Sequence, residues 1–183
     1  MANCRIRIYV TCDSQGNPIT SELGHYDIQF DGSYTIDGRS YTNPVISYSG
    51  GDGNPGKITI FNAAKTSTVF AGKKFQAYSF SFTATSNAVQ SCISSILSYL
   101  NTNNETQITS NAYRYNVTSG PYATYHLSST NCFSATATFA NWLGYSTLLG
   151  IYNAANGNYA SYSAYNMWLA YGNYWTYHGF YNC

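Results

Sequence analysis

The sequence predicts an α+β fold in which an antiparallel β-sheet packs against helices. Several segments between residues 5 and 82 alternate apolar and polar residues, as strands with one buried face do. Two of these segments flank an Asp31-Gly32 pair, which is a strong hairpin signal and indicates antiparallel pairing. Beyond residue 85 the apolar residues recur at every third or fourth position, which is the spacing of amphipathic helices.

Five strands are expected, over residues 5–12, 24–30, 33–36, 57–61 and 74–82. Turn-forming sequences at 15–18 and 49–56 separate some of them. The second strand alternates clearly: its apolar face carries Tyr26, Ile28 and Phe30, and its other face carries His25, Asp27 and Gln29. The alternation therefore places these three polar side chains together on one side of the sheet.

Two helices are expected after the strands. The first covers residues 86–100, is capped by Thr85 or Ser86, and has an apolar stripe formed by Val89, Cys92, Ile93, Ile96, Leu97 and Leu100. The second runs from Cys132 to about Leu143, with Thr130 or Asn131 as its N-cap and Gly144 at its end. Residues 101–111 are polar and are expected to form a loop. In the tail, residues 150–183, the only helix indicated lies near 159–171.

Length and charge limit the functions that fit this chain. Its 183 residues are enough for one domain with its own core. Only 8% of residues are charged and the net charge is +1, which argues against nucleic-acid binding because phosphate backbones attract basic surfaces. No apolar run reaches the length of a membrane span. The low charge and many tyrosines and asparagines favour a protein that is secreted or delivered outside the producing cell, although no N-terminal signal peptide is visible.

Five cysteines leave at least one thiol unpaired within a single chain. Cys4 and Cys12 lie on one expected strand and are too far apart to bridge each other, so either could pair with Cys183. There is no Cys-X-X-Cys pair and the three histidines are scattered. The sequence therefore predicts no metal site and no cofactor.

Cys132 is the candidate nucleophile. At the first turn of a helix, the macrodipole lowers a thiol pKa, and free backbone N–H groups can hold an oxyanion. Residues 115–183 contain no acidic or basic side chain other than His126 and His178, so a histidine must act as the base. The alternative is an unreactive cysteine buried at a helix start, which spacing alone favours.

His25, on the polar face of its strand, is the candidate base. A third group normally orients such an imidazole, and the strand after Asp31-Gly32 is its expected source. Two registers are open. In one, Phe30 pairs with Ser33, and Tyr34 and Ile36 share the face of His25. In the other, Phe30 pairs with Tyr34, and Thr35 and Asp37 share that face.

Asp37 is the preferred orienting group, because a carboxylate or hydroxyl orients an imidazole better than an isoleucine does. Thr35 belongs to the same register, and Asp27 shares the strand face of His25 in either register.

Four further residues are candidates for contact with substrate. Tyr125 and His126 lie just before the candidate nucleophile, and Trp168 and Trp175 lie in the aromatic tail. Stacked aromatic rings on a surface can hold sugar rings. The tail could therefore serve a glycan-binding or adhesion module as well as an enzyme.

Two segments carry a resemblance to a known family. Residues 125–144 (YHLSSTNCFSATATFANWLG) resemble the sequence around the cysteine of circularly permuted NlpC/P60-like proteins, which are papain-like. In that family the pattern is Y-x-L, followed by N-C-T-x-F-A, then a leucine, and then a glycine. Residues 24–32 (GHYDIQFDG) are similar to the histidine strand of that family, and the histidine precedes the cysteine as in its permuted branch. Phe133 departs from the pattern, since threonine is common at that position.

The resemblance implies a papain-like catalytic domain over residues 1–145, with residues 146–183 packed on it as a Tyr/Trp/Asn-rich segment. It implies that Cys132 attacks a carbonyl, that His25 moves the proton, and that water resolves the thioester. We therefore expect a thiol protease or amidase, acting on a peptide or on peptidoglycan. Such a secreted hydrolase could be an antibacterial effector, that is, a toxin with an immunity protein as partner. A thiol acyltransferase or lipase with the same dyad is the other enzymatic alternative.

Overall fold

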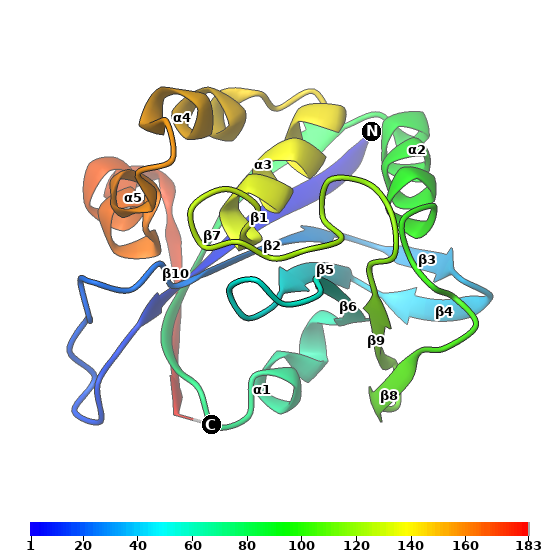
Figure 1. Cartoon of the computed structure of the whole chain (residues 1–183), viewed down its shortest axis with the longest axis horizontal. Coiled ribbons are helices and arrows are strands. Elements are labelled where there is room, and N and C mark those ends of the chain that lie inside the picture. Colours follow the sequence, from blue (N-terminus) through cyan, green and yellow to red (C-terminus); the bar gives the residue numbers. More distant parts are fainter. Residues whose placement is uncertain (183) are drawn as a thin grey trace.

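An eight-stranded antiparallel sheet runs through the centre of the computed structural model, which describes residues 1–182 (Figure 1). The strand order is β10-β7-β1-β2-β5-β6-β9-β8. Helices α2, α3, α4 and α5 lie on one side of this sheet, and α1 lies on the other (Figure 1). The α+β class and the antiparallel sheet packed against helices are as predicted.

The strands of the sheet are β1 (Ala2–Thr11), β2 (His25–Phe30), β5 (Pro44–Ser49), β6 (Lys57–Asn62), β7 (Lys74–Ala84), β8 (Thr106–Thr109), β9 (Ala112–Asn116) and β10 (Thr176–Asn182). A separate hairpin consists of β3 (Ser33–Ile36) and β4 (Arg39–Thr42). The α-helices are α1 (Thr66–Val69), α2 (Ser86–Leu97), α3 (Cys132–Trp142), α4 (Thr147–Ala155) and α5 (Ala164–Tyr171). Short 3-10 helices cover Ala63–Lys65, Tyr159–Tyr162 and Gly172–Tyr174.

Both predicted helices begin with the expected caps. The Thr85 side chain accepts a hydrogen bond from Ala88 N at the start of α2. At the start of α3, Asn131 and Ser134 form a reciprocal capping box. The first six residues of α3 are all buried, including Ser134 and Thr136, because the helix packs on β2 and β5 and is covered by α4. No helix within residues 1–182 is long and apolar enough to cross a membrane.

Side-chain alternation along β2 divides its residues between two cores. Tyr26 points toward α3, where its ring meets Phe133 with 4.8 Å between centroids. His25 points to the opposite face, where its ring meets Phe70 at 5.2 Å, just after α1. The second face has its own apolar clusters around Tyr9 and Phe61. The predicted division of β2 into an apolar and a polar face is therefore confirmed.

The predicted pairing after β2 is wrong in both registers. β3 pairs with β4, and the open edge of β2 pairs with β5. The hairpin forms at the next Asp-Gly pair, where Asp37 and Gly38 have φ of 50° and 71° and connect Ile36 to Arg39 in two residues. Positive φ at both central positions is what a tight hairpin of this kind requires.

Five strands and two helices were not predicted. β4, β5, β9 and β10 carry no expectation from the sequence, the supposed loop 101–111 contains β8, and helices α1 and α4 were also not expected. β4, β5, β8 and β9 are only four to six residues long, so alternation has little length over which to show. The tail helix expected near 159–171 is divided between a 3-10 turn and α5.

Candidate active site

A pocket of about 530 Å³ lies at the start of β2. Its wall includes His25, Ser47 and Thr59 from three successive strands of the sheet, together with Phe70. The cationic side chains lining it are Lys73, Lys74 and Arg114, and Glu22 is its acidic side chain. The pocket therefore combines titratable and hydroxyl groups with an excess of positive charge.

His25 and Ser47 are hydrogen-bonded in this wall. His25 Nε2 lies 2.7 Å from Ser47 Oγ, and both side chains are buried. The imidazole also packs against the rings of Phe70, at 5.2 Å, and Tyr9, at 5.9 Å, which contact each other. These neighbours hold the ring so that one nitrogen faces the serine hydroxyl.

Burial lowers the pKa of His25 to about 4, because the apolar rings around it disfavour the charged form. The negative charge of Asp27 opposes this effect, and the positive charge of Arg7 adds to it. At neutral pH the imidazole is therefore neutral, and Nε2 accepts the Ser47 hydrogen bond when the ring hydrogen is on Nδ1.

Cys132 lies at the start of α3, on the side of the sheet that this helix covers, and is buried. Its side chain is 2% exposed, and its thiol donates a long hydrogen bond to Gly24 O at 3.9 Å. Burial raises the pKa of the Cys132 thiol to about 11, although bonds from backbone N–H groups and the Tyr125 hydroxyl lower it. Burial outweighs the favourable helix start, so the sulfur is a neutral thiol at pH 7.

No hydrogen bond joins the Cys132 thiol to the His25 imidazole, and the two side chains leave the sheet on different faces. Gly24 O accepts the hydrogen bond from the Cys132 thiol, and the Tyr26 ring packs on Phe133 of α3. The imidazole of His25, which lies between these two residues in the chain, points instead to the side of α1. The physical reason is the apolar surface of α3, which packs against the apolar face of β2 and leaves the polar face of that strand on the opposite side. The expected Cys–His pair needs the polar face of β2 to meet α3.

Asp37 also lies apart from His25. Its carboxylate accepts hydrogen bonds from Arg39 Nη1 at 2.8 Å and from the Tyr115 hydroxyl at 2.9 Å, in the β3–β4 turn. Thr35 belongs to the same hairpin, where it pairs with Ser40 and is exposed.

Of the three proposed orienting residues, only Asp27 shares the face of His25. It is fully buried and binds Arg7 through two hydrogen bonds, of 2.6 and 2.9 Å. Its influence on His25 is therefore electrostatic.

The four expected substrate contacts lie in different places. Tyr125 is buried and lines the pocket of His25. His126 is about half exposed, with Nδ1 3.8 Å from Asp52. Trp168 packs on Tyr78 at 5.8 Å, and Trp175 donates its indole N–H to Met167 O at 3.3 Å.

Both tryptophans thus pack within the fold. Trp175 lines a separate apolar pocket of about 240 Å³, and neither ring borders the pocket of His25.

Ser47 and Arg114 were not predicted as site residues. Ser47 lies on β5, which was not recognised as a strand, so its place beside His25 could not be deduced. Arg114 did carry a signal, because it is the last charged residue before a long uncharged segment. Its Nε donates to Thr59 Oγ1 at 3.3 Å, which holds the guanidinium over the strand next to Ser47.

Cys4, Cys12, Cys92 and Cys132 are free, buried thiols within residues 1–182, and Cys183 lies outside the described residues. In the same part of the chain, no group of three His, Cys, Asp or Glu side chains could hold a metal ion. No family model, curated protein or solved structure matches the chain.

Proposed function

We propose that the protein hydrolyses ester or amide bonds, with Ser47 as the nucleophile and His25 as the general base. The observation that carries this proposal is the 2.7 Å contact between His25 Nε2 and Ser47 Oγ in the wall of a pocket. That distance is within the range for direct proton transfer between a nucleophile and its base. In the proposed mechanism the buried neutral imidazole is the tautomer with its hydrogen on Nδ1, in which Nε2 is unprotonated and accepts the proton.

The chemistry follows the usual course of covalent acyl transfer. His25 takes the Ser47 proton as Oγ bonds to the substrate carbonyl carbon, and then gives this proton to the departing alcohol or amine. The acyl-serine is hydrolysed by a water molecule whose proton passes to His25. Transfer of that proton back to Ser47 Oγ releases the acid and restores the starting state.

The charge of the pocket favours an anionic substrate. Lys73, Lys74 and Arg114 line it against one carboxylate, that of Glu22. Cations near the reacting carbonyl also stabilise the negative charge that develops on its oxygen. Carboxylate-bearing peptides, including those of peptidoglycan, belong to this substrate class, and a role as a secreted effector with an immunity partner stays a hypothesis.

The papain-like mechanism also stays a hypothesis. It requires His25 to approach the α3 side of the sheet and the Cys132 thiol, which is 2% exposed as Ser47 is, to lose its proton despite its raised pKa. Single substitutions separate the two mechanisms because the two nucleophiles lie on opposite faces.

Hydrolysis of p-nitrophenyl acetate and p-nitrophenyl hemisuccinate tests the proposal. Ser47→Ala and His25→Gln should each lower the rate by about 100-fold or more, the range for loss of acid–base or nucleophilic groups. Ser49→Ala is the matched control, because Ser49 lines the same pocket two residues along β5. A rate that depends on Cys132 and not on Ser47 would instead support the papain-like mechanism.

A further inference from the structure

A second pocket, of about 270 Å³, opens between β1, β7, β10 and the segment around α1. Polar side chains dominate its wall: Arg5, Arg7, Gln29, Thr66, Ser79 and His178. Tyr9 also lines it and separates these groups from His25, whose ring lies 5.9 Å away. This pocket is therefore distinct from the one that contains Ser47.

The two arginines are each fixed by a carboxylate that does not line the pocket. Arg5 donates from Nε and Nη2 to Asp31 at 3.0 and 2.8 Å, and Arg7 donates from Nε and Nη2 to Asp27. These bonds use one edge of each guanidinium. Arg7 Nη1 donates to Thr66 Oγ1 at 3.1 Å, and Arg5 Nη1 has no acceptor among the side chains and backbone groups that the structure describes.

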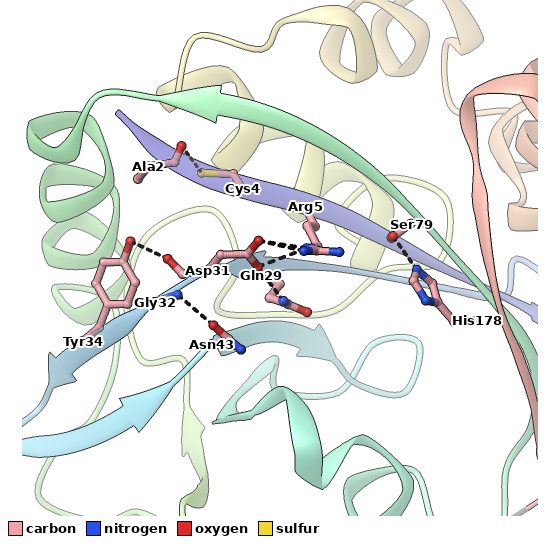
Figure 2. Close-up of polar contacts among 10 residues, drawn as sticks. All are labelled: Ala2, Cys4, Arg5, Gln29, Asp31, Gly32, Tyr34, Asn43, Ser79 and His178. Carbon is pink, nitrogen blue, oxygen red and sulfur yellow. Dashed lines mark hydrogen bonds and ion pairs between the residues drawn. The ribbon is translucent and has the colours of Figure 1, made fainter.

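His178 lies at a β-bulge in β10, and its side chain is on the same side as these arginines. The pairing of β10 with β7 shifts between Tyr177 and Gly179, which leaves His178 as the extra residue. Its Nε2 lies 2.6 Å from Ser79 Oγ. Figure 2 shows the Arg5 guanidinium between the Asp31 carboxylate and the Ser79–His178 pair.

The imidazole of His178 lies close enough to Arg5 and Arg7 to be affected by their positive charges. Burial lowers the pKa of His178, and the charges of Arg5 and Arg7 lower it further. An anion placed between the three side chains would meet hydrogen-bond donors and a favourable potential.

We propose that this pocket binds the phosphate or carboxylate group of a small molecule between Arg5, Arg7 and His178. Guanidinium groups that are already held in place lose little entropy when they bind an oxyanion. The pocket volume leaves room for more than the anionic group itself. The site is independent of the proposed hydrolase reaction, because it shares none of the residues that perform it.

Thermal unfolding in inorganic phosphate and in acetate, each compared with chloride at equal ionic strength, tests this site. At least one of the two anions should raise the Tm of the wild type above its value in chloride. A response to phosphate indicates a phosphate ligand, and a response to acetate indicates a carboxylate ligand. Arg5→Gln and His178→Gln should weaken the apparent affinity at least tenfold. Arg39→Gln is the matched control, since it removes another ion-paired arginine from the distant β3–β4 hairpin.

NMR signals of the His178 ring provide a second measurement that needs no substitution. They should shift with phosphate or acetate concentration and saturate. The proposal is overturned if neither anion acts beyond chloride, if the Arg5 and His178 variants respond as the wild type does, or if the His178 signals stay unchanged.

Discussion

Acidification should destabilise the protein through His25, by an amount that the structure sets. The pKa of His25 is about 4 in the folded chain, against 6.5 for an ordinary histidine. Between these two values the unfolded chain binds a proton that the folded chain does not. The free energy of unfolding therefore falls as the pH falls from 6.5 to 4. At about 1.4 kcal/mol for each pH unit, the total loss is about 3 kcal/mol.

Urea unfolding of the wild type and of His25→Gln at pH 7, 6, 5 and 4 measures this loss. Glutamine can keep a hydrogen bond to Ser47 but does not titrate, so the other acidic and basic groups contribute equally to both proteins. The wild type should lose about 3 kcal/mol more than the variant between pH 7 and pH 4. Parallel pH profiles would refute the reasoning, because they would mean that the His25 imidazole is free to ionise in the folded state.

Three further predictions concern Cys132, Asp27 and Gly24. Cys132, with its raised thiol pKa, should resist iodoacetamide at pH 7 until the chain unfolds, and selective labelling of the folded protein would contradict its burial. Asp27→Asn should lower the free energy of unfolding by about 3–5 kcal/mol, because it leaves Arg7 charged and unpaired; a loss under 1 kcal/mol in urea unfolding would count against this. Gly24→Ala should strongly lower the Tm, since its Cβ would lie within 3 Å of a β1 backbone oxygen at a φ of 74°. Gly38→Ala, at a similar φ in open space, should cost much less, and equal losses would contradict the packing argument.

The sequence was sufficient for the parts of the fold that local patterns determine. Alternation in β2 placed His25 and Asp27 on one face, and the spacing and caps located α2 and α3. It was not sufficient to decide which strands pair. Two Asp-Gly pairs lie six residues apart, and only the second forms the tight turn. Choosing between them depends on β5, whose pairing with β2 is a long-range contact.

The candidate site shows the same limit. His25 was identified from its strand position, but its partner Ser47 comes from the unrecognised β5. Cys132 was correctly placed at a capped helix start, yet that position does not reveal how deeply the thiol is buried. Helix α3 packs on the apolar face of β2, the face that carries Tyr26. Cys132 therefore lies on that side of the sheet, whereas His25 belongs to the opposite face of the same strand.

Reaction with a fluorophosphonate probe, followed by mass spectrometry of the labelled peptide, tests the proposed nucleophile most directly. Such probes bond covalently to serine hydroxyls that a neighbouring base activates, and they need no knowledge of the natural substrate. We expect a single adduct on Ser47 that is absent in Ser47→Ala and strongly reduced in His25→Gln. Absence of any adduct on Ser47 in the folded wild type, or labelling that persists unchanged in His25→Gln, would contradict the Ser47–His25 mechanism.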